Sequence, residues 1–309
     1  MRYVEVEGLR LSVIGLGTWQ FGSREWRYGE SYASDTAPAI VRRAIELGVT
    51  LIDTAEIYGF GRSERIVGEA ITGRRDGLVI ASKLVPALPL PAVVGWQVRG
   101  SLRRLGVEQI DLYQIHFPNP LASPRSTMAP LRTILEEGLV RHVGVSNYSL
   151  SRWRAAERAL GRPVLTNQVR FSLAAPLAHW ELVPYAREEE RVVIAYSPLG
   201  QGFLSGVRNL ASQAPADIRG RNRLFGPRSL RLSEPLLATL RDTAVAHGAT
   251  PAQVALAWLV GHGNVVAIPG AHTVAQLEEN VAAAELELSR AEMDRLTAEA
   301  ARFELAIRR

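Results

Sequence analysis

The segment LVIASK at residues 78–83 reads as a buried strand, and two further segments complete a unit around it. The amphipathic stretch PAVVGWQVRGSLRRL follows at residues 91–105, and the apolar stretch IDLYQIH follows at residues 110–116. Short apolar runs of this kind are typical of strands buried on both faces, whereas the longer periodic stretch indicates a helix. Parallel neighbouring strands need such a crossover connection. The three segments therefore predict a strand–helix–strand unit with parallel strands.

The same alternation recurs along nearly the whole chain. Predicted strands lie at Val13–Leu16, Leu51–Asp53, Leu78–Lys83, Ile110–His116, Arg141–Ser146, Leu165–Gln168, Val192–Tyr196 and Val265–Pro269. Predicted helices lie at Asp35–Leu47 (with Asp35 as N-cap), Ser63–Ile71, Pro91–Leu105, Thr127–Glu137, Ser151–Ala159, Leu177–Glu189, Pro235–Ala246 and Thr273–Ala283. Eight such pairs predict an α/β fold, namely a (β/α)8 TIM barrel.

Three additions to the barrel are expected. The segments Tyr3–Val6 and Leu9–Leu11 predict an N-terminal β-hairpin, and Pro251–Val260 and Ser289–Ala300 predict two extra helices. Because no linker rich in Pro, Gly or Ser divides the chain, residues 1–309 are predicted to form a single barrel domain. The long loops at residues 20–34 and 201–231 are candidates for a lid or clamp over a site.

The composition excludes several classes of protein. The formal net charge of +5 is spread along the chain without a basic tract, so no nucleic-acid partner is expected. No apolar run reaches the roughly 18 residues of a membrane span, and the N-terminus lacks a signal-peptide core. The absence of cysteine excludes disulfides and thiolate chemistry and favours a cytoplasmic location. The six histidines show no ligand spacing, so no metal site is expected.

Lys83 is the only lysine, so 35 of the 36 basic residues are arginine. Arginine cannot replace lysine where a compact ammonium must donate from a buried point, and Lys83 ends a predicted buried strand. Asp53 and His116 end two neighbouring strands, and Tyr58 lies five residues after Asp53. Because active sites of parallel barrels form where the strands end, these four side chains are expected to meet at one barrel mouth.

Their chemistry is mutually consistent with proton transfer to a carbonyl oxygen. A phenol titrates near pH 10, and an adjacent ammonium is expected to lower the pKa of Tyr58 by roughly 1–3 units. Asp53 would keep the buried Lys83 charged, and a neutral His116 would orient the substrate oxygen. Each residue alone also fits a structural role, as a turn cap or a half-buried core side chain. Together, however, the four groups could donate a proton to an oxygen atom or accept one from it. Reduction of a carbonyl by hydride transfer needs this proton transfer.

Seven motifs together resemble the aldo-keto reductase family, from about residue 9 to residue 300. They are LIDTAEIYG at 51–59, ASK at 81–83, DLYQIH at 111–116, GVSNY at 144–148, NQV at 167–169, YSPLG at 196–200 and IPG at 268–270. The resemblance is to a bacterial member, nearer the branch that includes potassium-channel β-subunit-like proteins. It implies Tyr58 as general acid, Lys83 and Asp53 as the pair that tunes it, and His116 as the residue that orients the substrate.

The resemblance also implies that NADP lies across the barrel mouth, and no Rossmann glycine motif contradicts this. Ser146, Asn147 and Gln168 match positions that bind the carboxamide, and Tyr196 matches the aromatic stacked on the nicotinamide. The full implied cofactor set is Gly17, Thr18, Trp19, Asp53, Ser146, Asn147, Gln168, Tyr196, Ser197, Pro198, Leu199, Gly200, Gln201, Gly202, Arg219, Arg221, Pro269, Gly270, Ala271, Gln276, Glu279 and Asn280. The expected substrate pocket is Trp19, Phe21, Trp26, Tyr28, Tyr58, His116 and Phe117, with Phe225 as a further candidate.

One departure from the family's pattern concerns the residues that bind the 2′-phosphate of NADP. Many reductases of this family carry Lys at the position of Gly270 and Arg at that of Gln276, and Arg219 or Arg221 would have to take over here. The sequence leaves three functions open. The first is an NADP-dependent carbonyl reductase or alcohol dehydrogenase acting on a small-molecule carbonyl or alcohol. The others are an NADP(H)-binding regulatory protein with little turnover and a Schiff-base aldolase using Lys83.

Overall fold

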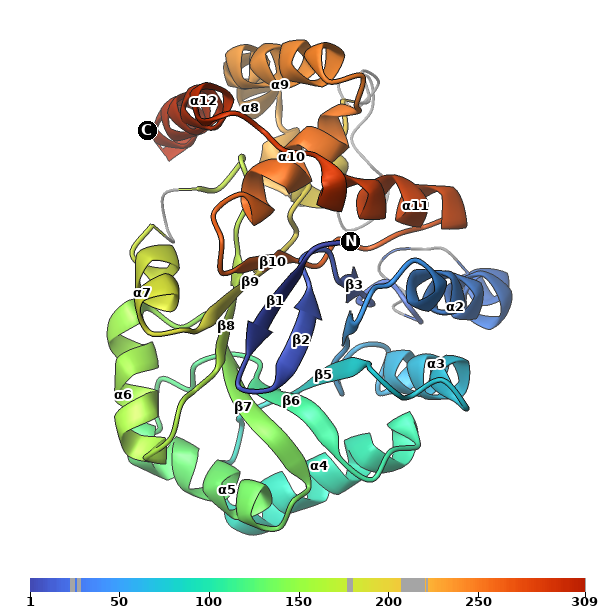
Figure 1. Cartoon of the computed structure of the whole chain (residues 1–309). Coiled ribbons are helices and arrows are strands. Elements are labelled where there is room, and N and C mark those ends of the chain that lie inside the picture. The colour runs from blue at the N-terminus through green and yellow to red at the C-terminus, as the bar shows by residue number, and fades with distance from the viewer. Residues whose placement is uncertain (23–25, 27–28, 177–179, 207–219, 221, 309) are drawn as a thin grey trace.

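Eight parallel strands curl into a barrel in the computed structural model (Figure 1), which describes residues 1–22, 26, 29–176, 180–206, 220 and 222–308. The sheet order is β10-β9-β8-β7-β6-β5-β4-β3, and a parallel bridge between Ile14 and Ala267 joins its two edges. The predicted (β/α)8 barrel is therefore confirmed. The strands are β3 (Leu16–Gly17), β4 (Leu51–Asp53), β5 (Val79–Leu84), β6 (Ile110–Ile115), β7 (Val140–Ser146), β8 (Thr166–Arg170), β9 (Val192–Tyr196) and β10 (Val265–Ala267).

Helices cover the outside of the sheet (Figure 1). In the described part of the chain they are α1 (Gly29–Ser31), α2 (Ala37–Glu46), α3 (Arg62–Ile71), α4 (Pro91–Leu105), α5 (Pro124–Glu136), α6 (Leu150–Leu160), α7 (Leu182–Glu188), α8 (Pro227–Leu232), α9 (Glu234–Ala246), α10 (Pro251–Val260), α11 (Val274–Ala282) and α12 (Arg290–Arg308). One buried apolar cluster runs from Val13 to Phe303 and joins these helices to the sheet. No helix among the described residues is long and apolar enough to cross a membrane.

A hairpin of β1 (Tyr3–Val6) and β2 (Leu9–Ser12) closes one end of the barrel, as the sequence predicts (Figure 1). Leu9 and Leu11 are buried in one cluster with Val79 and Val192, which begin β5 and β9. These contacts place the hairpin at the amino ends of the strands. The carboxyl ends form the opposite mouth, which carries the candidate site.

Alternation along the strands decides which side chains face the barrel axis. On β6, Leu112 contacts the interior cluster, Gln114 reaches Asp53 across the barrel, and His116 continues the same row. On β8, Thr166 bonds Gln114 and Gln168 bonds Asp53, so these alternate residues face inward as well. Polar inward residues therefore collect towards the carboxyl ends, above an apolar lower layer.

The starts of α2, α5 and α7 differ most from the predictions, and α5 begins at Pro124 rather than at Thr127. Asp35 does not cap α2, because residues 32–36 form a π-helical turn that leads into Ala37–Glu46 without a side-chain cap. Helix α7 begins at Leu182 rather than at residue 177, and residues 177–179 lie outside the described part.

Two other segments are more ordered than expected. The final helix continues to Arg308 instead of ending at Ala300, and its buried Phe303 stacks on Phe203. The segment 201–231, predicted as a long loop, contains in its described part a short 3₁₀ turn at Arg223–Phe225 and most of α8. Both differences arise because tertiary contacts at this edge of the barrel supply the burial that a polar, Arg-rich stretch lacks locally.

Candidate active site

Lys83, Asp53 and Tyr58 meet at the carboxyl-end mouth. The Lys83 Nζ atom donates to Asp53 Oδ2 at 2.6 Å, to the Thr54 carbonyl at 2.8 Å and to the Tyr58 hydroxyl at 3.4 Å. Lys83 is fully buried and Asp53 is 2% exposed. The predicted convergence of the ammonium, the carboxylate and the phenol is therefore present in the structure.

The second carboxylate oxygen of Asp53 is held by two amides. Gln168 donates to Asp53 Oδ1 at 2.7 Å, and Gln114 donates to the same atom at 3.4 Å. Gln114 was not among the predicted site residues. Its signal in the sequence was a polar residue two positions before His116, on the same alternating face of the strand as the apolar Leu112. These two amides satisfy the Oδ1 atom of Asp53 and thereby hold the Oδ2 atom towards Lys83.

His116 lies beside the phenol. Its ring meets that of Tyr58 edge to face with centroids 5.7 Å apart, and it stacks on Phe117 at 4.3 Å. Burial, aided by the nearby Lys83 charge, lowers the pKa of His116 to about 3. The imidazole is therefore neutral at physiological pH, as expected, and its Nδ1 atom has no hydrogen-bond partner among the described residues.

The direction of the Tyr58 pKa shift corrects the prediction. Burial raises the pKa of Tyr58 well above its usual value of 10, and the Asp53 carboxylate raises it further. The predicted lowering by Lys83 is outweighed by burial and by the Asp53 carboxylate, which lies 2.6 Å from the ammonium, whereas the Tyr58 hydroxyl lies 3.4 Å from it. Burial likewise lowers the pKa of Lys83, against the opposing effect of Asp53. Tyr58 thus holds its proton firmly.

A second polar group follows at the ends of β7, β8 and β9. Ser146 donates to the Gln168 carbonyl at 2.8 Å, and the Asn147 amide donates to Ser146 Oγ at 3.0 Å and to the His116 carbonyl at 3.3 Å. The Tyr196 hydroxyl donates to Asn147 Oδ1 at 3.0 Å. Asn147 has a φ of 62°, a left-handed conformation that asparagine tolerates better than most residues. These bonds fix the Tyr196 ring at the mouth.

The end of β3 approaches the β10 edge closely. A Cβ atom on Gly17 would lie 2.7 Å from the Ile268 carbonyl, so only glycine fits there. Thr18 is fully buried, and its hydroxyl donates to the Asp53 carbonyl at 2.8 Å and bonds Ser63 at 2.7 Å. Its side chain thus holds the barrel wall together behind Asp53.

The segment after β9 turns sharply over the mouth. Ser197 and Gln201 have positive φ angles of 49° and 61°, and Gln201 accepts a hydrogen bond from Asn222 at 2.8 Å. A cavity of about 460 Å³ lies here. Its walls include the predicted residues Trp19, Tyr196, Ser197, Gly200 and Gln201, while Pro198, Leu199 and Gly202 belong to the same turn.

The loop between β10 and α11 carries the remaining predicted cofactor positions. Pro269, Gly270 and Ala271 form the loop, and the Ala271 carbonyl accepts from Gln20 at 3.0 Å. Thr273 caps α11 by accepting from the Gln276 amide, while the Gln276 side chain accepts from the His272 amide. Two residues follow on the helix, the partly exposed Glu279 and the buried Asn280, whose amide donates to the Gly270 carbonyl at 3.4 Å.

The predicted aromatic pocket is brought together only in part. Trp19 and Trp26 pack edge to face with centroids 5.2 Å apart, and Phe117 is 46% exposed beside His116. Phe21 is fully buried against Tyr32, and Phe225 is buried against Phe203, so both pack in the core rather than facing the mouth. The rings of Phe21 and Phe225 bury more apolar surface area in the core than they would in an exposed loop. The predicted Tyr28, Arg219 and Arg221 lie outside the described residues.

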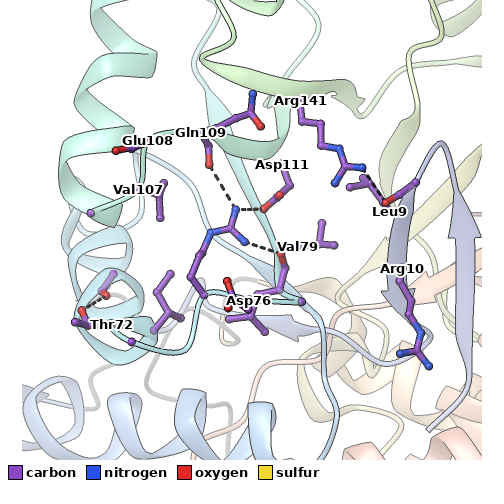
Figure 2. A pocket seen from close by; sticks show the side chains of 18 residues that line it. Leu9, Arg10, Thr72, Asp76, Val79, Val107, Glu108, Gln109, Asp111 and Arg141 are labelled. Carbon is purple, nitrogen blue, oxygen red and sulfur yellow. Dashed lines mark hydrogen bonds and ion pairs between the residues drawn. The ribbon is translucent and has the colours of Figure 1, made fainter.

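A larger hollow of about 670 Å³ opens at the hairpin end of the barrel (Figure 2). Arg75, one of its wall residues, donates to Asp111 at 2.5 Å and to the Leu78 carbonyl at 2.6 Å, and Arg141 donates to the Gly8 carbonyl at 3.0 Å. Arg75, Asp111 and Arg141 are thus already bonded within the protein. Among the described residues, no group of three or more His, Asp or Glu could hold a metal ion.

Known proteins match this chain over nearly its whole length. The model of the aldo/keto reductase family matches residues 13–300. An uncharacterised oxidoreductase of Mycobacterium tuberculosis is 56% identical over 304 residues, covering 98% of this chain and 94% of that protein. The methylglyoxal reductase YeaE of Escherichia coli is 33% identical over 293 residues, covering 92% and 89%. An aldo-keto reductase of Klebsiella pneumoniae solved with NADPH has a TM-score of 0.77 and 31% identity, covering 96% and 95%. The chain belongs to the aldo/keto reductase family.

Proposed function

We propose that this protein is an NADP-dependent carbonyl reductase that interconverts an aldehyde or ketone with an alcohol, using Tyr58 as general acid and base. The observation that carries the proposal is the 3.4 Å contact between the Tyr58 hydroxyl and the buried Lys83 ammonium, beside a neutral His116. Family membership and the NADPH-bound relative support the cofactor.

In the reducing direction, Tyr58 would donate its proton to the carbonyl oxygen. Its raised pKa keeps the phenol protonated until the oxygen becomes strongly basic, which happens only as the carbon is reduced. The phenolate left behind would lie 3.4 Å from Lys83, whose positive charge stabilises it. In the oxidising direction, the same phenolate would accept the proton of the alcohol.

Asp53 and His116 would support this step in different ways. Asp53 opposes the loss of charge that burial imposes on Lys83, since its carboxylate lies 2.6 Å from the ammonium. His116 remains neutral, so it can donate one hydrogen bond to the substrate oxygen without competing with Tyr58 as an acid. Tyr58 would thus transfer the proton, whereas His116 would orient the carbonyl oxygen that accepts it.

The residues at the mouth fit a nicotinamide dinucleotide. The β7–β8 edge offers uncharged amide and hydroxyl groups, which suit a neutral carboxamide, and we assign Ser146, Asn147 and Gln168 to it. Tyr196 would support the ring, and the backbone amides at the start of α11 suit a phosphate. When bound, the reduced nicotinamide supplies the hydride.

We also propose the branch of the family, the domain organisation and the substrate class of this protein. The glycine at 270 and the glutamine at 276 favour the branch that includes potassium-channel β-subunit-like proteins. One continuous buried cluster from Val13 to Phe303 supports residues 1–309 acting as a single domain. The relative named as a methylglyoxal reductase supports a small aldehyde as substrate.

Single-turnover kinetics test the proposed function. Enzyme loaded with NADPH is mixed with methylglyoxal or para-nitrobenzaldehyde, and the loss of the reduced-nicotinamide absorbance is followed. We expect Tyr58→Phe to slow this step about 10²–10⁴-fold while NADPH still binds. Near-normal rates in the variant would exclude Tyr58 as the general acid. Tight NADPH binding without turnover in the wild type would instead support the regulatory alternative, and borohydride trapping on Lys83 would support the aldolase.

A further inference from the structure

Four residues lie in one row across the neighbouring strands β5, β6, β7 and β8. Lys83 on β5 pairs in register with Gln114 on β6. Gln114 pairs in turn with Gly144 on β7, which pairs with Thr166 on β8. Gln114 and Thr166 are fully buried, and burying an amide costs free energy unless its polar atoms find partners. The row therefore places an amide beside the Lys83–Asp53 pair in a dry interior.

Both ends of the Gln114 amide are bonded, and the two partners fix its orientation. Thr166 donates to the Oε1 atom at 3.3 Å, and the Nε2 atom donates to Asp53 Oδ1 at 3.4 Å. A carboxylate only accepts hydrogen bonds, so the amide nitrogen has to face Asp53. The Thr166 hydroxyl opposes the reversed orientation, in which the amide oxygen would face the carboxylate and repel it.

The glycine at residue 144 provides the space for this arrangement. A Cβ atom on Gly144 would lie 2.9 Å from the Gln114 Cγ atom and would overlap the Thr166 hydroxyl. A larger residue would therefore push apart the two side chains that bond each other across β7. The missing side chain on β7 lets β6 and β8 interact inside the barrel.

Gln114 and Gln168 hold the same oxygen of Asp53 from two different strands. Gln168 donates at the shorter distance of 2.7 Å, but the proposed function also assigns it to the cofactor carboxamide. Gln114 is fully buried two residues before His116, so a ligand at the mouth does not compete for its amide. Gln114 thus remains available to Asp53 whether or not the cofactor is bound.

We infer that Gln114, oriented by Thr166, is a positioning residue for the proton transfer at Tyr58. This inference rests on the proposed function, because it takes Tyr58 to be the proton donor. With its Oδ1 atom held by amides, Asp53 presents Oδ2 to the Lys83 ammonium, which also reaches the Tyr58 hydroxyl. Gln114 touches neither substrate nor cofactor, so its loss should slow the chemical step and leave binding unchanged.

Single-turnover kinetics on a methionine variant test the inference. Methionine has nearly the length of glutamine but cannot donate a hydrogen bond. We expect Gln114→Met to slow the reduction of para-nitrobenzaldehyde by bound NADPH roughly 10-fold, in line with the loss of a hydrogen bond to a charged group. The aldehyde concentration that gives half the maximal rate and the Kd of NADPH should each change less than about twofold, because uniform binding is kept.

Replacement by glutamic acid makes the same contact depend on pH. The introduced carboxyl would lie buried beside the Asp53 carboxylate, so its pKa should rise well above the usual value of about 4.3. When protonated it can donate to Asp53 as the amide does, whereas its ionised form would repel Asp53. The single-turnover rate of Gln114→Glu should therefore approach that of the wild type at low pH and fall as the pH rises through this pKa.

The neighbouring titratable groups do not produce this step. They are Asp53, Lys83, Tyr58 and His116, all of which the wild type and Gln114→Met share with Gln114→Glu. The pKa of His116 is lowered to about 3, and that of Tyr58 is raised well above 10, so neither changes its protonation state near neutral pH. The wild type and Gln114→Met should both lack the extra step.

Further variants keep the test decisive. Thr166→Val removes the hydroxyl that orients Gln114, so it should slow the step in the same direction by a smaller factor. It supplies the answer if Gln114→Met fails to fold. Thr243→Val is its matched control, since this buried hydroxyl bonds the Thr239 carbonyl within α9. Gln109→Met, at an exposed position before β6, is the control for Gln114→Met, and neither control should change the rate.

The outcomes separate the inference from the proposed function. A lower Tm with an unchanged single-turnover rate in Gln114→Met would mean that Gln114 only fills space, which overturns the inference. A loss confined to NADPH or aldehyde binding would overturn it too, as would a Gln114→Glu rate that equals that of Gln114→Met at every pH. If the wild type reduced no aldehyde, or if Tyr58→Phe were as fast as the wild type, the proposed function would fail first.

Discussion

The Lys83 ammonium is fully buried and lies 2.6 Å from one carboxylate oxygen of Asp53. Two opposite charges placed in a dry site compensate each other, but each alone carries a large desolvation cost. The pair therefore constrains the fold as well as the chemistry, and neither member can be removed without stranding the other.

Asp53→Asn should destabilise the protein by about 3–5 kcal/mol, because it leaves the Lys83 charge buried without a partner. Urea unfolding at neutral pH measures the change. The double variant Asp53→Asn/Lys83→Met is the control, since it removes the stranded charge and should recover much of the loss. A single variant as stable as the wild type would show that Lys83 is neutral in the folded protein.

Gly270→Lys alone should not create a binding contact to the 2′-phosphate of NADP. A Cβ atom at residue 270 would overlap the Gln20 side chain, which is held by the Ala271 carbonyl. We expect a lower Tm and no gain in the preference for NADPH over NADH. The double variant Gly270→Lys/Gln20→Ala removes the clash and should restore the Tm, as thermal unfolding and cofactor titration would reveal. An unchanged Tm in the single variant would contradict this explanation.

The strand pattern predicted the barrel and the convergence at its mouth closely. The strands at Leu51–Asp53 and Val192–Tyr196 have the predicted bounds, as do the helices at Pro91–Leu105 and Pro251–Val260. These segments are either apolar runs or strongly periodic helices, so local pattern and tertiary burial agree. Strand ends then place Asp53, Lys83 and His116 without further information.

What the sequence could not predict depended on distances between elements. Burial raises the Tyr58 pKa, and the Asp53 carboxylate raises it further. Neither effect follows from the sequence, because both depend on how deeply the phenol is buried and on how close it lies to Asp53 and Lys83. Phe21 resembles a pocket residue in a loop, yet its ring packs in the core against Tyr32. Local composition cannot distinguish an aromatic side chain that lines a mouth from one that closes the core behind it.

Leu11→Ala should destabilise the barrel by about 2–5 kcal/mol, because this fully buried side chain fills the hairpin end. The active-site mouth lies at the other end, so kcat for the folded enzyme should remain close to that of the wild type. Leu121→Ala removes an equal volume from a side chain that is 96% exposed, and it should leave stability unchanged. Denaturant unfolding and steady-state kinetics on the same preparations measure stability and kcat separately. A large loss of kcat in Leu11→Ala would show that the hairpin end and the active-site mouth are not independent.

His262 should make the fold sensitive to acid. Its ring lies among Phe171, Trp180 and Trp258, and burial lowers its pKa from 6.5 to about 4. Between these pH values the unfolded chain binds a proton that the folded protein does not, so stability is full above pH 6.5 and falls as the pH approaches 4. The slope is about 1.4 kcal/mol per pH unit, or about 3 kcal/mol in all.

Replacing His262 with phenylalanine keeps a planar ring in the aromatic cluster but removes the titrating nitrogens. The free energy of unfolding, measured in urea at pH 7, 5 and 4, should therefore fall less steeply in His262→Phe than in the wild type. The comparison is between slopes, so a change in absolute stability caused by packing does not affect it. The buried His116 contributes acid sensitivity to both proteins and cancels in the difference. Parallel slopes for His262→Phe and the wild type would mean that His262 titrates as it does in the unfolded chain.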